Sequence, residues 1–225
     1  MRFIDKNGEF VIKPKFDDIW DFREGLAGVG LNGKRGFIDK NGEFVIEPKF
    51  DDTRSFWEGL AGVKLNGKWG FIDKSGKIVI KPKFNAVWGF SEGLAAVELN
   101  GKWGFIDKNG EFVIEPKFDE AWSFWEGLAG VKLNGKWGFM DKNGKIVIEP
   151  KFDGVGKFSE GLAGVKLNGK YGFIDKNGEF VIKPNFDDAW YFREGLAKVG
   201  LNGKYGFIDK SGKIVIEPIF DDIDY

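Results

Sequence analysis

Pairs of adjacent carboxylates recur along the chain, and they are the residues best suited to carry out chemistry. Asp17–Asp18 and Asp51–Asp52 each follow a Lys-Phe pair, and two carboxyl groups are the minimum equipment of a glycosidase. The same position reads Asn85–Ala86 and Asp153–Gly154 in other copies. Catalysis requires one site that differs from the other copies. Because these acids vary among the copies without singling out one of them, we interpret them as part of a solvated surface.

A second set of oxygen-bearing residues lies in Asp107–Glu111, where Asp, Asn and Glu occupy alternate positions. This order is similar to the start of a calcium loop, which also needs about a dozen residues and a late bidentate Glu. Two copies read Asp73–Lys77 and Asp209–Lys213, with Lys in place of the last acid. Since Asn-Gly is sufficient to form a turn, we predict a turn here and no metal site.

Composition narrows the remaining chemistry. Cysteine and histidine are both absent, which excludes disulfides, thiolate ligands and the side chain best suited to proton transfer near neutral pH. The 34 basic and 35 acidic residues give a formal net charge of -1, whereas a nucleic-acid surface needs a basic field. No copy differs chemically from the others in the way an active site would. We therefore expect no catalytic residue, no cofactor and no enzymatic activity.

Aromatic residues are the set most suited to binding, with 24 Phe, 9 Trp and 4 Tyr. Most Phe positions recur unchanged and are expected in the core. Two registers vary instead, and they often hold Trp or Arg, the residues that dominate binding hot spots. The first rim register is Trp20, Arg54, Trp88, Trp122, Gly156 and Trp190, and the second rim register is Arg23, Trp57, Ser91, Trp125, Ser159 and Arg193.

The candidate binding rim consists of the Trp and Arg residues of these two registers. Its members are Trp20, Arg23, Arg54, Trp57, Trp88, Trp122, Trp125, Trp190 and Arg193. The alternative interpretation is that these side chains pack between neighbouring copies and vary as loops ordinarily do.

The rim is positioned by a repeat of 34 residues. The Phe of a Gly-Phe pair stands at Phe37 and recurs with this spacing to Phe207, and Phe3 is the seventh member. The spacing never slips, which leaves no linker. We predict a single repeat domain over residues 1–225, with a partial unit at 1–32. The six full units begin near Gly33, Gly67, Gly101, Gly135, Gly169 and Gly203.

Each unit has the pattern of short β-strands. Residues Ala95–Leu99 alternate with the period of two that a strand requires. Asn100–Gly101 then predicts a two-residue hairpin of type I′. Pro116 cannot donate to a sheet ladder, so it should end its strand or lie on an edge. The Gly of each Glu-Gly-Leu is expected to release the chain into the next copy, and no segment has helical spacing.

One meander of three or four short strands cannot bury enough apolar surface alone, so neighbouring copies must stack. We predict an all-β, propeller-like ring of six or seven antiparallel β-meander units. The small residues of Leu60–Leu65 and its equivalents are expected on the innermost strand. The alternative is an open β-solenoid of stacked hairpins. An open strand edge would favour pairing with a second copy of the chain.

The Trp-Gly pairs at Trp69–Gly70, Trp103–Gly104 and Trp137–Gly138, each within Gly-Lys-Trp-Gly-Phe, resemble the bacterial WG-repeat family. Segments such as Val45–Asp51 share this resemblance, which covers essentially the whole chain. It implies an all-β tandem array with binding or scaffolding roles and no shared catalytic residue. Three units depart from the Trp of the pair, with Arg35, Tyr171 and Tyr205.

The copies are unusually alike, and the units that begin at Gly67 and Gly101 differ at 11 of 34 positions. This similarity indicates recent amplification or design from a consensus sequence. The favoured function is a non-enzymatic scaffold or interaction module, and the alternative is a carbohydrate or cell-wall binding module that uses the candidate rim. The expected partners are a protein, a glycan or a second copy of the chain, and neither nucleic acid nor a membrane.

The sequence also bears on location. No apolar run approaches the roughly 20 residues that span a bilayer, and the opening Met1–Phe10 has no apolar signal core. We therefore expect a soluble protein without a signal peptide or transmembrane segment, in a compartment that the sequence does not indicate.

Overall fold

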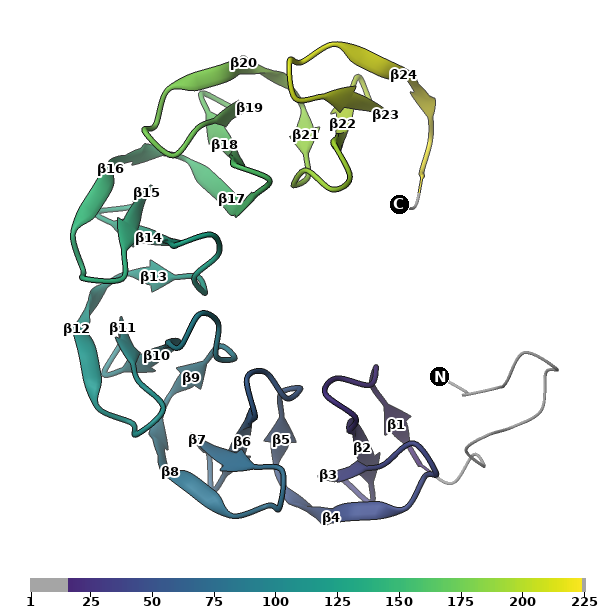
Figure 1. Ribbon diagram of the computed structural model, residues 1–225, viewed down its shortest axis with the longest axis vertical. Helices are drawn as coiled ribbons and strands as arrows, with labels where there is room; N and C mark the ends of the chain where they lie inside the picture. The colour runs from purple at the N-terminus through teal and green to yellow at the C-terminus, as the bar shows by residue number, and fades with distance from the viewer. Residues whose placement is uncertain (1–15, 224–225) are drawn as a thin grey trace, which may run out of the picture. The chain divides into compact units, whose positions relative to one another are not determined.

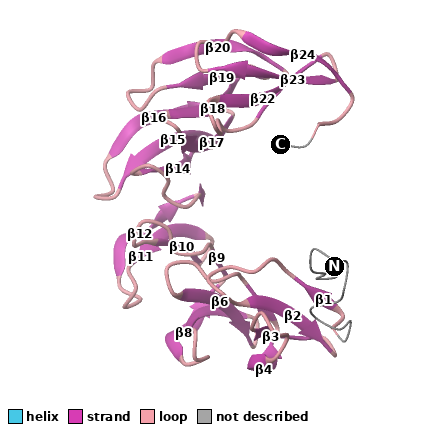
Figure 2. Ribbon diagram, turned by 45° about the vertical axis from the view of Figure 1, so that its right-hand side comes forward, coloured by secondary structure: helices cyan, strands magenta, loops and turns pink. Residues whose placement is uncertain are grey.

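The chain is built from four-stranded antiparallel sheets joined by turns (Figures 1 and 2). A computed structural model describes residues 16–223, in which 24 strands form six such sheets. These residues contain no helix, and therefore no helix that could cross a membrane. Phe3 and the rest of residues 1–15, the first part of the expected partial unit, lie outside the described residues.

The residues separate into two compact units, with the boundary between Lys117 and Phe118 at the end of a strand. In unit 1, sheet 1 is β1 (Asp18–Ile19), β2 (Ala27–Leu31), β3 (Lys34–Ile38) and β4 (Phe44–Phe50). Sheet 2 is β5 (Asp52–Thr53), β6 (Leu60–Leu65), β7 (Lys68–Asp73) and β8 (Ile78–Phe84). Sheet 3 is β9 (Ala86–Val87), β10 (Ala95–Leu99), β11 (Lys102–Ile106) and β12 (Phe112–Phe118).

Unit 2 repeats this plan. Sheet 4 is β13 (Glu120–Ala121), β14 (Leu128–Leu133), β15 (Lys136–Asp141) and β16 (Ile146–Phe152). Sheet 5 is β17 (Gly154–Ser159), β18 (Leu162–Leu167), β19 (Lys170–Ile174) and β20 (Phe180–Phe186). Sheet 6 is β21 (Asp188–Ala189), β22 (Leu196–Leu201), β23 (Lys204–Asp209) and β24 (Ile214–Phe220). In every sheet, strands that are consecutive in the chain pair side by side.

The predicted Asn-Gly hairpins are confirmed. Asn100 and Gly101 have φ of 52° and 78°, and both central residues of a type I′ turn need positive φ. The turn joins β10 to β11 in register, with Leu99 opposite Lys102 and Ala95 opposite Ile106.

A second tight turn, at Glu-Gly, was not predicted. Glu126 and Gly127 also have positive φ, of 52° and 87°. Trp125 and Leu128 on either side exchange both backbone hydrogen bonds, at 2.9 and 3.2 Å. The prediction that this glycine releases the chain into the next copy is therefore wrong, because the pair closes a hairpin inside one sheet.

The glycine of the Trp-Gly pair lies against the backbone of the neighbouring strand. A Cβ on Gly70 would be 2.4 Å from the carbonyl oxygen of Ile80 and 2.6 Å from the nitrogen of Pro82. The register between β7 and β8 shifts between Trp69 and Phe71, which is the sign of a β-bulge. The same approach recurs at Gly36, Gly104, Gly138, Gly172 and Gly206.

Proline lies on an edge strand, as one of the two predicted alternatives had it. β8 continues through Pro82 to Phe84 and is the last strand of its sheet. An edge strand tolerates a residue without an N–H because its outer side pairs with no neighbour.

The expectation for the small-residue strand is wrong. Leu60–Leu65 forms β6, which is the second strand of sheet 2, and the two-residue strand β5 occupies the edge beside it. The small residues have a different cause. A Cβ on Gly62 would lie 3.0 Å from Val87 of sheet 3, so packing between sheets keeps this position small.

Each sheet buries its apolar face against the next sheet of the same unit. Phe37 of sheet 1 packs edge to face on Phe56 of sheet 2, with ring centroids 4.9 Å apart. Both rings are almost completely buried. Equivalent pairs are Phe71–Phe90, Phe139–Phe158 and Phe173–Phe192. Stacking of copies, as predicted, supplies the core.

Replacing Gly172 by Ala tests the close approach. The added methyl group would lie 2.5 Å from the carbonyl oxygen of Ile182. Because the obstructing atoms belong to the backbone, we expect the free energy of unfolding to fall by about 3 kcal/mol, the upper end of overpacking costs. Urea denaturation followed by tryptophan fluorescence measures the change.

Gly156→Ala is the matched control in the same sheet. Its Cβ would meet nothing closer than 3.6 Å, so its effect should stay within about 0.5 kcal/mol. Equal denaturation midpoints for the two variants would contradict the role assigned to the glycine.

Candidate functional site

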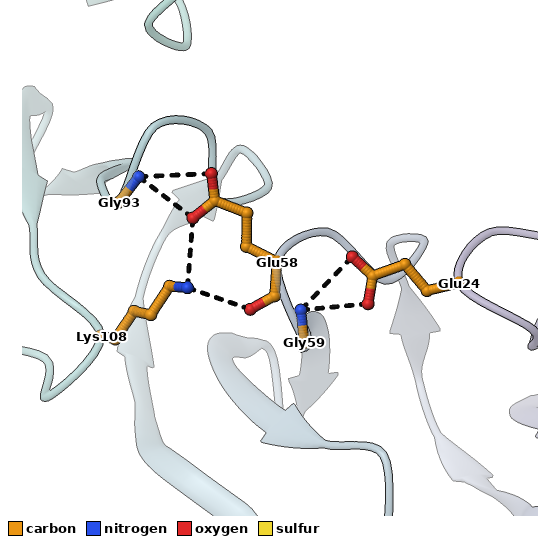
Figure 3. A network of polar contacts seen from close by, with 5 residues as sticks. All are labelled: Glu24, Glu58, Gly59, Gly93 and Lys108. Atoms are coloured by element: carbon orange, nitrogen blue, oxygen red, sulfur yellow. Dashed lines mark hydrogen bonds and ion pairs between the residues drawn. The ribbon is translucent and has the colours of Figure 1, made fainter.

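A contact between three residues links consecutive sheets of one unit (Figure 3). The carboxylate of Glu58 accepts the backbone N–H of Gly93, with N–O distances of 3.0 and 3.3 Å. Lys108 donates to the backbone carbonyl of Glu58 at 3.1 Å and lies 3.2 Å from its carboxylate. We call this arrangement the Glu-Gly-Lys clasp. It recurs as Glu24–Gly59–Lys74, Glu126–Gly161–Lys176 and Glu160–Gly195–Lys210.

The clasp explains why glutamate occupies a left-handed turn position. A residue with a side chain pays about 1–2 kcal/mol for this conformation, and Glu58 adopts it with φ of 52°. The turn aims the carboxylate at the next sheet, where an N–H and an ammonium group meet it. The hydrogen bond from Lys210 lowers the pKa of Glu160, and the N–H of Gly195 adds to this effect.

The acids that could have formed a catalytic pair take part in similar contacts. Lys34 Nζ of sheet 1 lies 2.8 Å from Asp51 Oδ1 of sheet 2. This hydrogen bond lowers the pKa of Asp51, and the N–H of Gly67 lowers it further. The same link joins Lys136 to Asp153 at 2.6 Å. These carboxylates are held ionised between sheets.

The candidate calcium segment forms the predicted turn. Asp107 Oδ1 accepts the backbone N–H groups of Asn109 and Glu111 at 2.9 and 3.0 Å. The bond from Glu111 is the largest cause of a lowered pKa at Asp107, although desolvation acts in the opposite direction. The carboxylate is thus used to close the turn.

The second rim register packs against the following sheet. The guanidinium of Arg23 lies 4.9 Å from the ring centroid of Trp57. The Trp57 ring in turn covers Gly89, where a Cβ would come within 2.9 Å of it. Ser159 Oγ donates to the backbone carbonyl of Phe192 at 2.7 Å. These contacts match the alternative interpretation, in which the side chains pack between copies.

The first rim register packs within its own sheet, on the residue that precedes the glycine of each Lys-X-Gly. Trp122 stacks on Trp137 with centroids 5.6 Å apart and an interplanar angle of 12°. Trp88 stacks on Trp103 at 6.4 Å, and Trp190 meets Tyr205 edge to face at 5.6 Å. In the remaining pairs a cation takes part, as Arg35 over Trp20 and Arg54 over Trp69.

Sheet 5 departs from this rule because Gly156 occupies the first rim register. No side chain from that position covers Tyr171, which is only half-buried. The sheet also has a continuous six-residue first strand, β17, where the other sheets have two-residue strands.

The missing side chain opens a pocket of about 340 Å³ within unit 2. Five rings line it, from three consecutive sheets: Trp122, Trp137, Tyr171, Trp190 and Tyr191. Its backbone lining includes Gly154, Gly156 and Gly164. We call this pocket the aromatic slot.

Two lysines give the aromatic slot a positive character. Lys157, which lines it, lies 4.3 Å from the ring centroid of Trp125 and 3.8 Å from that of Tyr191. Lys166 lies 5.1 Å from the ring centroid of Tyr171. Among residues 16–223, no carboxylate forms an ion pair with either lysine.

The family described as WG containing repeat matches the chain in seven tandem copies. The matched residues are 1–34, 36–69, 69–103, 103–137, 137–171, 171–205 and 205–225. The chain belongs to the WG-containing-repeat family. In the Trp-Gly pair of the WG repeat, the glycine therefore lies against the next strand, and the tryptophan is the residue on which the first rim register packs. No curated protein matches this WG-repeat chain.

Solved structures similar to the WG-repeat chain share little sequence with it. Kluyveromyces lactis Hsv2p aligns over 86% of this chain and 75% of its own, with a TM-score of 0.57 and 11% identity. A eukaryotic initiation factor aligns over 92% and 66%, with a TM-score of 0.61 and 12% identity. YCF48 bound to D1 peptide aligns over 89% and 81%, with a TM-score of 0.50 and 15% identity. These similarities show an all-β, propeller-like fold, and closure of the WG repeats into a ring remains a prediction.

The structure gathers only part of the candidate rim at one place. Trp122 and Trp190 line the aromatic slot, and Trp125 approaches it through Lys157. Arg193 belongs to unit 2 but does not line the slot. The remaining rim residues belong to unit 1: Trp20, Arg23, Arg54, Trp57 and Trp88.

The aromatic and charged slot residues that the rim omitted are Trp137, Lys157, Tyr171 and Tyr191. A signal for them was present in the sequence. Gly156 is the one glycine in the first rim register. Where one copy of a repeat lacks a side chain that the other copies have, the space of that side chain is left empty.

Glu24→Gln tests the clasp, because it keeps an acceptor oxygen and removes the charge that pairs with Lys74. We expect a loss of about 1 kcal/mol or less at pH 7, the usual size for a partly solvated ion pair. Burial raises the pKa of Glu24, but the bonds from Lys74 and Gly59 outweigh burial and lower it overall. A carboxylate with a lowered folded-state pKa stabilises above its unfolded pKa, and this stabilisation is lost as the pH falls through the folded value.

Thermal unfolding at several pH values provides the measurement. The difference between wild type and Glu24→Gln should shrink as the pH falls below the ordinary glutamate pKa of about 4.3, and disappear once the folded-state carboxyl group is protonated as well. Glu47→Gln, on the exposed edge strand β4, is the control and should change little at either pH. A difference that stays unchanged at low pH would show that charge is not the cause.

Proposed function

We propose that this WG-repeat domain is a non-enzymatic interaction module that recognises its partner through the aromatic slot. The observation that carries the proposal is the slot itself, since its volume of about 340 Å³ lies within the range of ligand pockets. Five aromatic rings and few polar groups match the usual lining of such pockets. Every other sheet fills the equivalent position with a side chain of its own.

The titratable groups support a role without catalysis. A general acid or base near neutral pH needs a pKa tuned toward the working pH. The carboxyl groups of Asp51, Asp107, Glu160 and Asp209 have instead lowered pKa values, caused by turn or inter-sheet hydrogen bonds. Such acids stay ionised and hold the architecture together.

Rigidity of the lining also supports the proposal. The slot is supported by paired strands and by stacked rings, such as Trp122 on Trp137. Preorganised aromatic side chains lose little conformational entropy when a partner binds. YCF48, whose structure is similar to that of this chain, was solved bound to a D1 peptide, and we extend to this chain the idea of a propeller-like fold that holds a peptide.

A carbohydrate ligand is the second candidate, and the parallel rings favour it. Trp122, whose side chain is exposed, is held within 12° of parallel to the buried ring of Trp137, and a flat apolar face can bury one side of a sugar ring. The slot is long enough to involve three sheets, which suits an extended chain molecule.

Binding assays with paired tryptophan variants test the proposed function. Trp122→Ala should weaken binding of whichever probe the domain recognises by about tenfold or more, the scale of an aromatic hot spot. Trp20→Ala replaces the equivalent residue in unit 1, is similarly exposed in the wild type (38% against 40%), and should leave binding unchanged.

The probes are a panel of neutral and acidic oligosaccharides and a display library of random peptides, with tryptophan emission and calorimetry as readouts. A panel without any binding would remove the proposal. Binding that Trp20→Ala weakens as much as Trp122→Ala would place recognition elsewhere.

A further inference from the structure

Sheet 4 shows what normally occupies the position that is hollow in sheet 5. Glu120 lies opposite Lys132 in the β13–β14 pairing, and the two side chains form an ion pair at 2.6 Å. Two residues later, Trp122 stacks on Trp137. In extended backbone, residues two apart point to the same face. The first strand of sheet 4 and the residue that follows it thus place one carboxylate and one indole on the same face.

Sheet 5 has lost both groups and kept both of their partners. Gly154 takes the place of Glu120 and lies opposite Lys166. Gly156 takes the place of Trp122. Lys166 and Tyr171 remain, although no carboxylate of residues 16–223 pairs with this lysine.

The surroundings of the glycine on the second strand show how much space the missing side chains leave. In sheet 4, a Cβ on Gly130 would meet Trp122 and Val155 at 3.0 Å each. In sheet 5, the closest atom to a Cβ on Gly164 is Cε1 of Phe173, at 3.6 Å. Neither Gly156 nor Ala189, the counterpart of Val155 in sheet 6, covers Gly164. The hollow therefore has the place and the neighbours of an indole.

We propose that the aromatic slot binds an acidic peptide segment that carries a tryptophan within two residues of a carboxylate. The indole would fill the space between Trp122, Tyr171 and Trp190, and the carboxylate would pair with Lys166 or Lys157. This inference rests on the proposed function, which it narrows to one class of partner. The segment Glu120–Trp122 of this chain is a natural template for such a ligand.

Charge favours this occupant over a neutral sugar. Lys157 is held between the rings of Trp125 and Tyr191, and Lys166 lies beside Tyr171. Burying either ammonium group under a neutral ligand would remove water without supplying a counter-charge, which costs free energy. An acidic peptide supplies the charge and the ring together.

The binding test uses a peptide copied from this chain. Fluorescein-labelled Lys-Phe-Asp-Glu-Ala-Trp-Ser, the sequence of residues 117–123, is titrated with the protein of residues 1–225, and fluorescence anisotropy is measured. We expect a dissociation constant of about 0.1 mM, typical of a short segment that must be ordered on binding. Replacing its Trp by Ala, or its Asp and Glu by Asn and Gln, should each weaken binding about tenfold.

Variants of sheet 5 locate the binding. Gly156→Trp should fill the slot from within and weaken peptide binding at least about tenfold, while Trp20→Ala, which lies in unit 1 outside the slot, should leave it unchanged. Lys166→Met keeps the aliphatic stem and should weaken the acidic peptide but not its Asn and Gln version. Circular dichroism verifies that each variant is folded.

The double variant Gly154→Glu with Gly156→Trp is a test that needs no ligand. A filled slot and a new partner for Lys166 should raise the melting temperature above that of wild type. A lower melting temperature would show that the hollow does not fit an indole, and would overturn the inference.

The remaining outcomes separate the inference from the function on which it rests. Binding of tetragalacturonate in place of the peptide, removed by Gly156→Trp, would overturn the peptide inference and retain the interaction module. Peptide binding that Gly156→Trp leaves intact would do the same. Absence of binding by the peptide and by every probe of the panel would overturn both.

Discussion

The contact on which this fold depends is the approach of two backbones at the glycine of the Trp-Gly pair. The carbonyl oxygen of Ile80 and the nitrogen of Pro82 occupy the space that a side chain at Gly70 would need. A proline without an N–H and a local bulge in the edge strand accommodate the approach. With the glycine fixed, Trp69 and Phe71 on either side take the positions from which they pack on the next sheet. The family signature is therefore a requirement of strand packing.

The Glu-Gly-Lys clasp adds directional polar contacts to the apolar packing between sheets. The glutamates of the four clasps, Glu24, Glu58, Glu126 and Glu160, adopt a strained turn, and their carboxylates are satisfied by the following sheet. The aromatic pairs, such as Phe37 with Phe56, supply buried apolar contacts, while the clasp links neighbouring turns at a fixed offset. Individually these exposed ion pairs contribute little, but they recur at every sheet junction described within the two units. Each of these junctions thus contains both a strained turn and the polar contacts that compensate for it.

Local patterns predicted the strands, the Asn-Gly hairpins and the turn at Asp107 correctly, because each of these depends on residues close together in the sequence. They failed at Glu126, since glutamate has no intrinsic preference for positive φ and its stabilising partner, Gly161, lies 35 residues away. Leu60–Leu65 was misplaced within its sheet because a two-residue strand such as β5 leaves no periodic signal. The rim was predicted from what Trp and Arg usually do, whereas the slot is defined by Gly156, a residue notable for what it lacks.

The constant offset of the clasp has an evolutionary consequence. In each of the four described clasps the glutamate binds a glycine 35 residues later and a lysine 50 residues later, so duplication or loss of one copy by recombination recreates the same junction without further mutation. A single copy can meanwhile diverge on its first strand, as sheet 5 has done, without disturbing the hydrogen bonds that its neighbours need. The copy that is duplicated is also the unit that forms the contacts with its neighbours. New binding specificity can therefore arise in one copy while the other copies keep their sequence and contacts.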